Sequence, residues 1–324
     1  MILDGIYGAA VSARNSLYDR RIFKPGHLNW PVVSIGNISA GGSGKTPFVI
    51  ALGELLLKRG MWIDVLSRGY RRSTSGVLAV NAAGTPEQFG DEPLLIARKL
   101  HCPVIVGENR YSAGLYAESE HGKPDNSLHL LDDGFQHRQL HRDFDIVLLN
   151  REDLDDKLIP SGHLRESVQS LNRANAVVVD REFDSATIPK GEFAIWRMEK
   201  KVDVPELNEP VIAFCGIARP QRFFSALRSA GTRVKQELTF RDHHRYCHAD
   251  VKRLLEAKTR VPGSILVTTE KDAINLGPYL DEVRPVVVPM QIELMDSENV
   301  LNSLLGKVAE CSARPSLPSV SAST

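Results

Sequence analysis

The chain carries a glycine-rich segment, Gly36-Asn37-Ile38-Ser39-Ala40-Gly41-Gly42-Ser43-Gly44-Lys45-Thr46-Pro47, between an apolar run at 32–35 and a helical pattern at about 47–59. A strand, a glycine-rich loop and a helix in this order are typical of a phosphate-binding P-loop. The glycines let backbone N–H groups surround a phosphate, and the helix N-terminus adds partial positive charge. The sequence therefore predicts a nucleotide site whose binding residues are Gly41, Gly42, Ser43, Gly44, Lys45 and Thr46.

Two side chains of this loop carry chemistry. In a P-loop the lysine, here Lys45, reaches the β- and γ-phosphates, and the hydroxyl that follows it, here Thr46, binds Mg²⁺. The loop departs from the common GxxxxGK(S/T) pattern because Ser39 stands at the first glycine position. The two glycines that follow supply flexibility instead. The alternative interpretation is a glycine-rich turn that binds no nucleotide.

The type of nucleotide follows from a second motif. Proteins that bind GTP recognise the base with Asn/Thr-Lys-x-Asp, and this pattern does not occur in the sequence. The nearest match, Thr269-Glu270-Lys271-Asp272, places the lysine directly before the aspartate. We therefore expect ATP, together with Mg²⁺.

Apolar runs alternate with helical patterns along most of the chain. The first series lies at 32–35, 62–66, 104–106, 128–131, 146–149 and 176–179. This rhythm predicts an α/β fold of the P-loop type, with a parallel sheet and helices on both faces. A shorter series at 211–214, 234–240, 265–267 and 286–288 predicts a second, smaller α/β domain.

We expect three parts along the chain. Residues 1–190 form the P-loop domain with an N-terminal amphipathic helix, and residues 191–311 form the smaller domain with its linker strands. Segments 193–198 and 290–294 alternate in polarity, which predicts a two-stranded connection between the domains. Residues 312–324 are rich in Ser and Pro and are expected to be a disordered tail.

Acidic side chains are expected near the phosphate loop. Asp132 and Asp133 end an apolar run, where a strand of this fold delivers carboxylates to Mg²⁺, although Asp also ends strands at simple turns. Asp91 precedes a helical pattern, and on spacing alone it is as well explained as an N-cap as by catalysis. The basic segment 67–72 after the second run suits an anionic substrate or a solvated turn.

Composition limits the classes of function. The 324 residues contain 40 Lys+Arg and 40 Asp+Glu, and this balance argues against a general nucleic-acid binder. Four cysteines lie far apart without a CxxC pair, which favours a reducing compartment, the cytoplasm. No segment is apolar over the roughly 18 residues that a transmembrane helix requires.

The N-terminus has an amphipathic pattern. Its apolar stripe consists of Leu3, Ile6, Tyr7, Ala10 and Val11, and it is followed by Arg14, Arg20, Arg21 and Lys24. A helix of this kind can lie on an anionic membrane surface. The alternative is a helix that packs its stripe against its own domain.

Histidines gather in the second series. Asp242, His243, His244 and His248 resemble a metal cluster, but no cysteine or further carboxylate completes a ligand set. A histidine that assists a base is the simpler interpretation.

Taken together, the motifs resemble those of the tetraacyldisaccharide 4′-kinase family. The matching segments are GNISAGGSGKTP, SRGY, GDEP, LDDGFQH, IPSGHLRE, GIARPQRFF, DHH and VTTEKDA, in this order and over about residues 1–295. Ser39 agrees with that family, whereas His163 stands where the family often has a small residue or proline.

The resemblance implies a reaction and a set of site residues. It implies transfer of the ATP γ-phosphate, with Mg²⁺, to the 4′-hydroxyl of a tetraacylated glucosamine disaccharide 1-phosphate, by a peripheral enzyme at the cytoplasmic face of a Gram-negative inner membrane. It assigns metal binding and transfer to Asp132 and Asp133, the role of base to Asp91, and the role of its partner to His243. Further active-site positions are Gln136, Arg165 and Glu166.

Two other interpretations remain open from the sequence. One is a P-loop ATPase or metallochaperone-like switch, in which hydrolysis drives a conformational change and the histidines carry metal. The other is a nucleotide-binding module without catalysis, which is disfavoured because Lys45, Thr46 and the two aspartates occur together.

Overall fold

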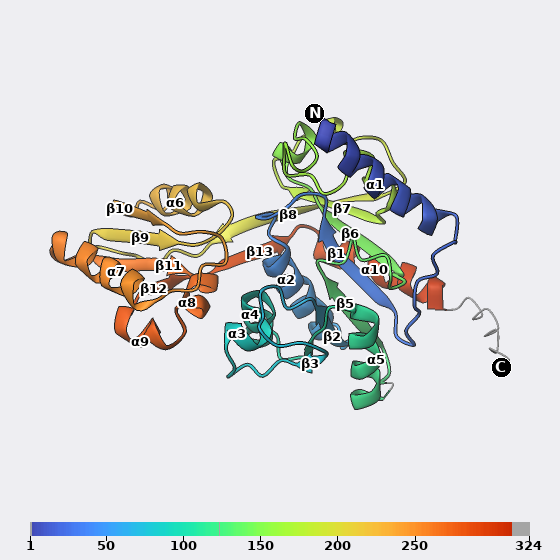
Figure 1. Ribbon diagram of the computed structural model, residues 1–324, viewed down its shortest axis with the longest axis horizontal. Helices are drawn as coiled ribbons and strands as arrows, with labels where there is room; N and C mark the ends of the chain where they lie inside the picture. The colour runs from blue at the N-terminus through green and yellow to red at the C-terminus, as the bar shows by residue number, and fades with distance from the viewer. Residues whose placement is uncertain (1, 123, 313–324) are drawn as a thin grey trace.

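The computed structural model describes residues 2–122 and 124–312, and the predicted tail lies almost entirely outside these residues. Within them the strands form two sheets (Figure 1). The larger sheet has the spatial order β13 (Met290–Leu294), β8 (Ala194–Val202), β7 (Ala176–Asp180), β6 (Phe144–Leu148), β1 (Val32–Asn37), β5 (Ser127–Asp132), β2 (Trp62–Ser67), β4 (Val104–Val106) and β3 (Leu78–Ala79). The smaller sheet has the order β10 (Val234–Thr239), β9 (Val211–Cys215), β11 (Ile265–Thr269) and β12 (Val286–Val288).

Helices cover both faces of each sheet. The longer ones are α1 (Ile2–Asp19), α2 (Lys45–Lys58), α4 (Asp91–Lys99), α5 (Arg110–His121), α6 (Pro220–Ser229), α7 (His248–Arg260) and α10 (Ser297–Ser312). The shorter ones are α3 (Pro86–Phe89), α8 (Glu270–Leu276), α9 (Leu280–Val283) and four 3₁₀ turns, η1 (Arg151–Leu154), η2 (Val168–Arg173), η3 (Ser185–Thr187) and η4 (Gly277–Tyr279). The predicted α/β class is confirmed.

The central strands of the larger sheet are buried on both faces, which explains why their sequences are continuous apolar runs. Strand β1 pairs in parallel with β5 and with β6, and every residue of β1 is buried. One face of the sheet packs against α2, α4 and α10, and α5 packs on the other. A strand that is covered on both faces loses the alternation of a half-exposed strand.

Parallel pairing brings three loops to one edge of the sheet. Ile35 of β1 lies opposite Asp132 of β5, and Leu131 of β5 lies opposite Leu66 of β2. The loops that follow these strands therefore begin side by side at their carboxyl ends, where ligands bind in open α/β sheets.

The two segments expected to connect the domains do pair with each other. Strand β13 runs antiparallel to β8, from Met290 opposite Val202 to Leu294 opposite Met198. Strand β8 also pairs in parallel with β7, so both strands belong to the edge of the larger sheet. In Figure 1 they run from that sheet toward the smaller one.

The C-terminal helix departs from the expected division of the chain. Residues 191–311 were expected to form the smaller domain, but Val300, Leu301 and Leu304 of α10 are buried in the core of the larger sheet. The chain passes back through β13 into the first core, where α10 covers apolar surface beside α2. Apolar periodicity predicts a helix but not the core that buries its apolar face.

None of the helices within the described residues is both long and apolar enough to cross a bilayer. Helix α1 lies along the larger lobe, and polar contacts hold it there. Tyr7 Oη donates to the Arg165 carbonyl at 3.2 Å, and Asn15 Nδ2 donates to Glu166 at 2.7 Å. Leu3 and Ile6 are 65% and 62% exposed, so the apolar stripe is only partly turned toward the protein.

Candidate active site

The phosphate loop owes its shape to three glycines. Gly41, Gly42 and Gly44 have φ values of 76°, 63° and 88°, in the left-handed region that side chains with a Cβ rarely adopt. Ser39 is not among the residues with positive φ, and it forms an isolated bridge with Leu164. A serine therefore fits at the position where most P-loops carry their first glycine.

The smaller domain approaches this loop closely. A Cβ atom added to Gly42 would lie 2.9 Å from Arg219 Cγ, and one added to Gly41 would lie 3.1 Å from Ala218 Cβ. Arg219 is also 3.1 Å from Glu152. The loop after β9 thus rests on the phosphate loop, and a larger residue at position 42 would displace it.

Lys45 contacts polar groups at the ends of two neighbouring strands, β1 and β5. Its Nζ atom donates to Asn37 Oδ1 at 3.0 Å and lies 3.4 Å from Asp133. Asp133 also accepts from Arg165 Nη1 at 3.0 Å. Burial alone would raise the pKa of Asp133, but Lys45 and Arg165 more than offset this and hold it well below its usual range.

Asp132 has a different environment. It is 2% exposed and accepts from Ser67 Oγ at 2.9 Å through one oxygen, while Oδ1 is buried without a partner in the described part of the chain. Burial, together with the charges of Glu92 and Asp133, raises the pKa of Asp132 to about 7. A buried carboxylate oxygen without a donor is well suited to a divalent cation.

The buried side chains around the loop suit bound Mg²⁺ and phosphate. Thr46 is buried at the start of α2, and the Ser43 hydroxyl is buried without a partner among the described residues. Within residues 2–122 and 124–312 no three His, Cys, Asp or Glu side chains form a group able to enclose a metal. Mg²⁺ beside a nucleotide is typically held by one or two protein oxygens with phosphates and water, which matches this donor set.

Asp91 and His243 come together from different domains. Asp91 is the first residue of α4, and its oxygens lie 3.0 and 2.8 Å from His243 Nδ1. Asn275 Nδ2 donates to Asp91 at 3.1 Å. Burial raises the pKa of Asp91, but His243, Lys271 and Asn275 outweigh burial and lower it to about 2.

Lys271 completes this cluster, and the sequence reasoning gave it no role. Its Nζ atom lies 3.3 Å from Glu92, 3.4 Å from Asp242 and 3.2 Å from His243 Nε2. Burial would lower the pKa of Lys271, but the surrounding carboxylates raise it above its usual value. The available signal was the segment VTTEKDA, which was considered only as the nearest match to a guanine-recognition motif and as part of the family resemblance.

Of the other expected active-site residues, Gln136 and Arg165 lie near the phosphate loop, whereas Glu166 has a structural role. Gln136 Nε2 donates to the Asn37 carbonyl at 2.9 Å, and Arg165 reaches Asp133, so both contact residues beside Lys45. Glu166 is buried but accepts from Arg173 at 2.8 Å and from Asn15 of α1. Its contacts therefore fix α1 and η2 to the segment that carries Arg165.

The neighbouring histidines of the smaller domain contact different carboxylates. His243 contacts Asp91, whereas His244 Nε2 lies 2.9 Å from Asp250. His248 is the first residue of α7. Each of the first two histidines is thus engaged by its own acidic partner.

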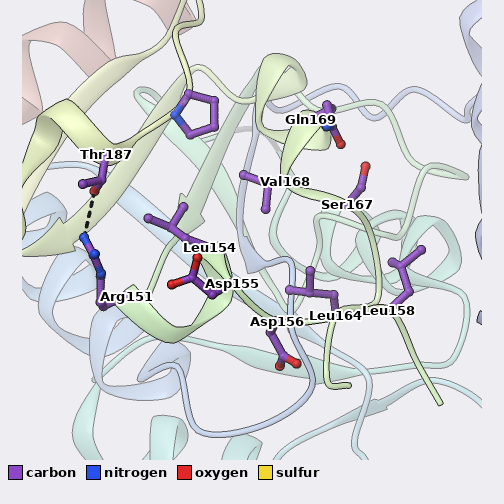
Figure 2. A pocket seen from close by; sticks show the side chains of 11 residues that line it. Arg151, Leu154, Asp155, Asp156, Leu158, Leu164, Ser167, Val168, Gln169 and Thr187 are labelled. Atoms are coloured by element: carbon purple, nitrogen blue, oxygen red, sulfur yellow. Dashed lines mark hydrogen bonds between the residues drawn. The ribbon is translucent and has the colours of Figure 1, made fainter. Parts of the chain in front are cut away.

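A cavity of about 570 Å³ lies apart from these residues. Figure 2 shows Leu154, Leu158, Leu164 and Val168 around it, together with Asp155 and Asp156. Its lining includes neither the phosphate loop nor Asp91 and His243. The chemistry described above is therefore located at the strand edge and the domain contact rather than in this cavity.

A mainly parallel α/β sheet with this glycine loop, lysine and paired aspartates defines a P-loop kinase fold. The model of the family described as "Tetraacyldisaccharide-1-P 4'-kinase" matches residues 1–309. The chain belongs to this family.

Two curated relatives and one solved structure illustrate the similarity. The tetraacyldisaccharide 4'-kinase of Koribacter versatilis is 45% identical over 94% of this chain and 97% of its own length. That of Aquifex aeolicus is 39% identical over 85% of this chain and 88% of its own length. A crystal structure of LpxK from Aquifex aeolicus in complex with ATP has a TM-score of 0.76 and 33% identity, covering 94% of this chain and 97% of that one.

Proposed function

We propose that this protein transfers the γ-phosphate of ATP to the 4′-hydroxyl of a tetraacylated glucosamine disaccharide 1-phosphate, a step of lipid A biosynthesis. The family name describes this 4′-phosphorylation. The observation that carries the proposal is the contact of 2.8 Å between Asp91 and His243, made at the domain contact in a protein with a P-loop. The relatives' names support the substrate, and the ATP complex of the similar structure supports the nucleotide.

The phosphate loop binds the nucleotide in this proposal. Backbone N–H groups at Gly41–Gly44 surround the phosphates, and Lys45 turns from Asn37 and Asp133 to the transferring phosphate. Thr46, Asp132 and Asp133 would hold Mg²⁺. When bound there, Mg²⁺ neutralises negative charge on the phosphates.

Asp91 and His243 act on the acceptor hydroxyl. As the bond from the 4′-oxygen to the γ-phosphorus forms and the bond to ADP breaks, the hydroxyl proton passes to Asp91. A carboxylate with a pKa near 2 is a weak base, so His243 at 2.8 Å orients it and shares the proton. Loose phosphoryl-transfer transition states demand positioning and charge neutralisation more than a strong base.

The acceptor lipid determines where the protein works. Its acyl chains hold it in a bilayer, so the enzyme acts as a peripheral protein at the cytoplasmic face of the inner membrane. The exposed side chains of Leu3 and Ile6 on α1 offer apolar surface to the headgroup boundary. Arg14 and Arg20 are exposed on and next to the same helix and attract anionic lipid.

The division into domains is part of the same proposal. We assign residues 203–289, with the sheet β10-β9-β11-β12, to the smaller domain, and we assign β8 and β13 to the connection. The smaller domain then contributes His243 to one end of the site and Arg219 to the phosphate loop.

A product assay tests the function. Purified protein is incubated with γ-labelled ATP, Mg²⁺ and the acylated disaccharide 1-phosphate, and the lipids are separated. We expect label in a bisphosphorylated lipid. ATP consumption without a labelled lipid would contradict the proposal and favour the ATPase switch.

A further inference from the structure

A second hollow lies at the domain contact, beside the Asp91–His243 pair. It has a volume of about 420 Å³ and is lined by Arg71, Arg241, His244 and Arg245. Arg71 comes from the loop after β2, and the other three come from the loop after β10. Two domains therefore build one strongly basic concave surface.

The positive charge of this hollow is incompletely compensated. The Arg71 guanidinium donates to the carbonyls of Asp242 and His243, at 2.9 and 3.1 Å, and these groups carry no net charge. The Arg241 guanidinium has no hydrogen bond or ion pair with the described part of the chain. Arg245 lies 3.7 Å from Glu87 and also donates to the Arg71 carbonyl.

The other acidic groups nearby are already paired. Asp242 lies 3.4 Å from Lys271, and Asp250 accepts from His244. Three guanidinium groups thus face one carboxylate at 3.7 Å, and the hollow retains net positive charge. Guanidinium groups bind phosphate oxygens in bidentate geometry, so this surface suits a phosphate monoester.

The hollow is directly linked to the catalytic pair. The same loop presents the His243 imidazole to Asp91 on one side and its carbonyl to Arg71 on the other. The Tyr70 ring packs edge-on against His243, with centroids 5.1 Å apart. A rigid sugar substrate whose hydroxyl reaches Asp91 can therefore extend an anionic group toward Arg71 and Arg241.

We propose that this hollow binds the 1-phosphate of the disaccharide substrate and so selects acceptors that already carry a phosphate at the far end. The inference rests on the proposed function, because it assumes a disaccharide 1-phosphate at the Asp91–His243 pair. Headgroup phosphates of the membrane share the same chemistry, and the experiment separates the two sources.

The test compares two acceptors with one variant. Arg241→Ala is suitable because the Arg241 guanidinium has no partner within the described residues and lies outside the catalytic groups. The full-length protein is assayed with the tetraacylated disaccharide 1-phosphate and with the same lipid lacking the 1-phosphate. We expect Arg241→Ala to raise KM for the phosphorylated acceptor about 10- to 100-fold, with kcat within about 2-fold, and to leave the other acceptor unchanged.

Two further variants define the specificity of the effect. Arg241→Lys keeps the charge but not the bidentate geometry and should recover part of the lost affinity. Arg260→Ala removes an arginine of the same domain that is 74% exposed and pairs with Glu256, and it should change neither acceptor.

Several results would overturn the inference. Equal changes in KM for both acceptors, or no change in KM for either, would show that the hollow does not recognise the 1-phosphate. Loss of binding to phosphatidylglycerol vesicles without loss of acceptor discrimination would assign it to headgroups instead. If the wild-type protein phosphorylates neither acceptor, the proposed function fails. The role of the hollow is then decided by binding: dissociation constants for the two lipids are measured directly, and their ratio is compared between wild type and Arg241→Ala.

Discussion

The carboxylate of Asp91, at the start of α4, lies 2.8 Å from Nδ1 of His243, a residue 152 positions later in the chain and on the other side of the domain contact. Both side chains are largely buried. Lys271 lies close to each of them. The pair exists only while the two domains touch, so a functional link between these residues is also a test of the domain contact.

The first prediction concerns the coupling of this pair. Asp91→Ala and His243→Ala should each lower kcat strongly, and the double variant should be little worse than the poorer single variant. The reason is that each residue acts through the other across one hydrogen bond. Steady-state kinetics of the three variants provide the test, and losses that multiply would indicate independent roles.

Lys271 should set the acidity of Asp91. Replacing it by Met removes a cation 3.8 Å from Asp91, so the pKa of Asp91 should rise from about 2. Because protonated Asp91 cannot accept a proton, the acid limb of the kcat/KM profile should move to higher pH. Lys271→Arg should keep the wild-type limb. An unchanged limb in Lys271→Met, with melting temperature measured in parallel, would contradict this role.

Loss of Lys45 should lower kcat strongly and leave the folded state intact. Lys45→Ala removes a positioned cation from the transferring phosphate and should lower kcat by roughly 10³-fold. Asp133 keeps Arg165 at 3.0 Å as a partner, so the folded state should persist. Near-normal kinase activity with an intact melting transition would contradict the assignment of the nucleotide site.

The exposed apolar end of α1 should bind membranes. Leu3→Asp with Ile6→Asp should reduce co-sedimentation with anionic vesicles, and wild-type binding should weaken as salt is raised. Since both side chains are more than half exposed, at 65% and 62%, the melting temperature should stay close to that of the wild type. Ser12→Asp, at an exposed position of the same helix, is the matched control. Unchanged vesicle binding with a lowered melting temperature would favour packing of the stripe against the protein.

A buried histidine should make stability depend on pH. His129 is fully buried, 2.8 Å from Asp64 and 3.4 Å from Glu118, and it stacks on Trp30. Burial alone would lower the pKa of His129, but the two carboxylates outweigh burial and raise it above its usual value of 6.5. The folded protein then binds this proton more tightly than the unfolded chain, so the stabilisation is fully present below about pH 6.5 and is lost as pH rises through the folded pKa.

The variant His129→Gln tests this effect. It removes one partner of a buried ion pair and should lower the free energy of unfolding by about 3 kcal/mol at pH 6. The difference from wild type should shrink as pH rises through the folded pKa of His129, because the wild-type histidine then loses its charge too. Denaturant unfolding over a series of pH values from about 6 upward measures this, and a difference that stays constant across the series would exclude a charged His129.

Much of the nucleotide site was accessible from the sequence. The phosphate loop, its lysine and threonine, and the aspartates at the end of β5 are local features, because a loop between one strand and one helix is fixed by adjacent residues. The alternation of apolar runs and helical patterns also predicted the α/β class. The alternating polarity of segments 193–198 and 290–294 predicted the pairing of β8 with β13. The resemblance supplied Asp91 and His243, whose spacing alone gave no reason to place them together.

Local sequence was sufficient to predict the α/β class, the phosphate loop and its chemistry, because backbone conformation and apolar periodicity depend on neighbouring residues. The arrangement of these local features around one site depends on long-range packing. Only the packing of the two sheets placed Lys271 against Asp91, Arg219 against Gly42 and α10 in the first core. These contacts join residues far apart in the chain, and their formation depends on how whole apolar faces are buried, which no local pattern encodes.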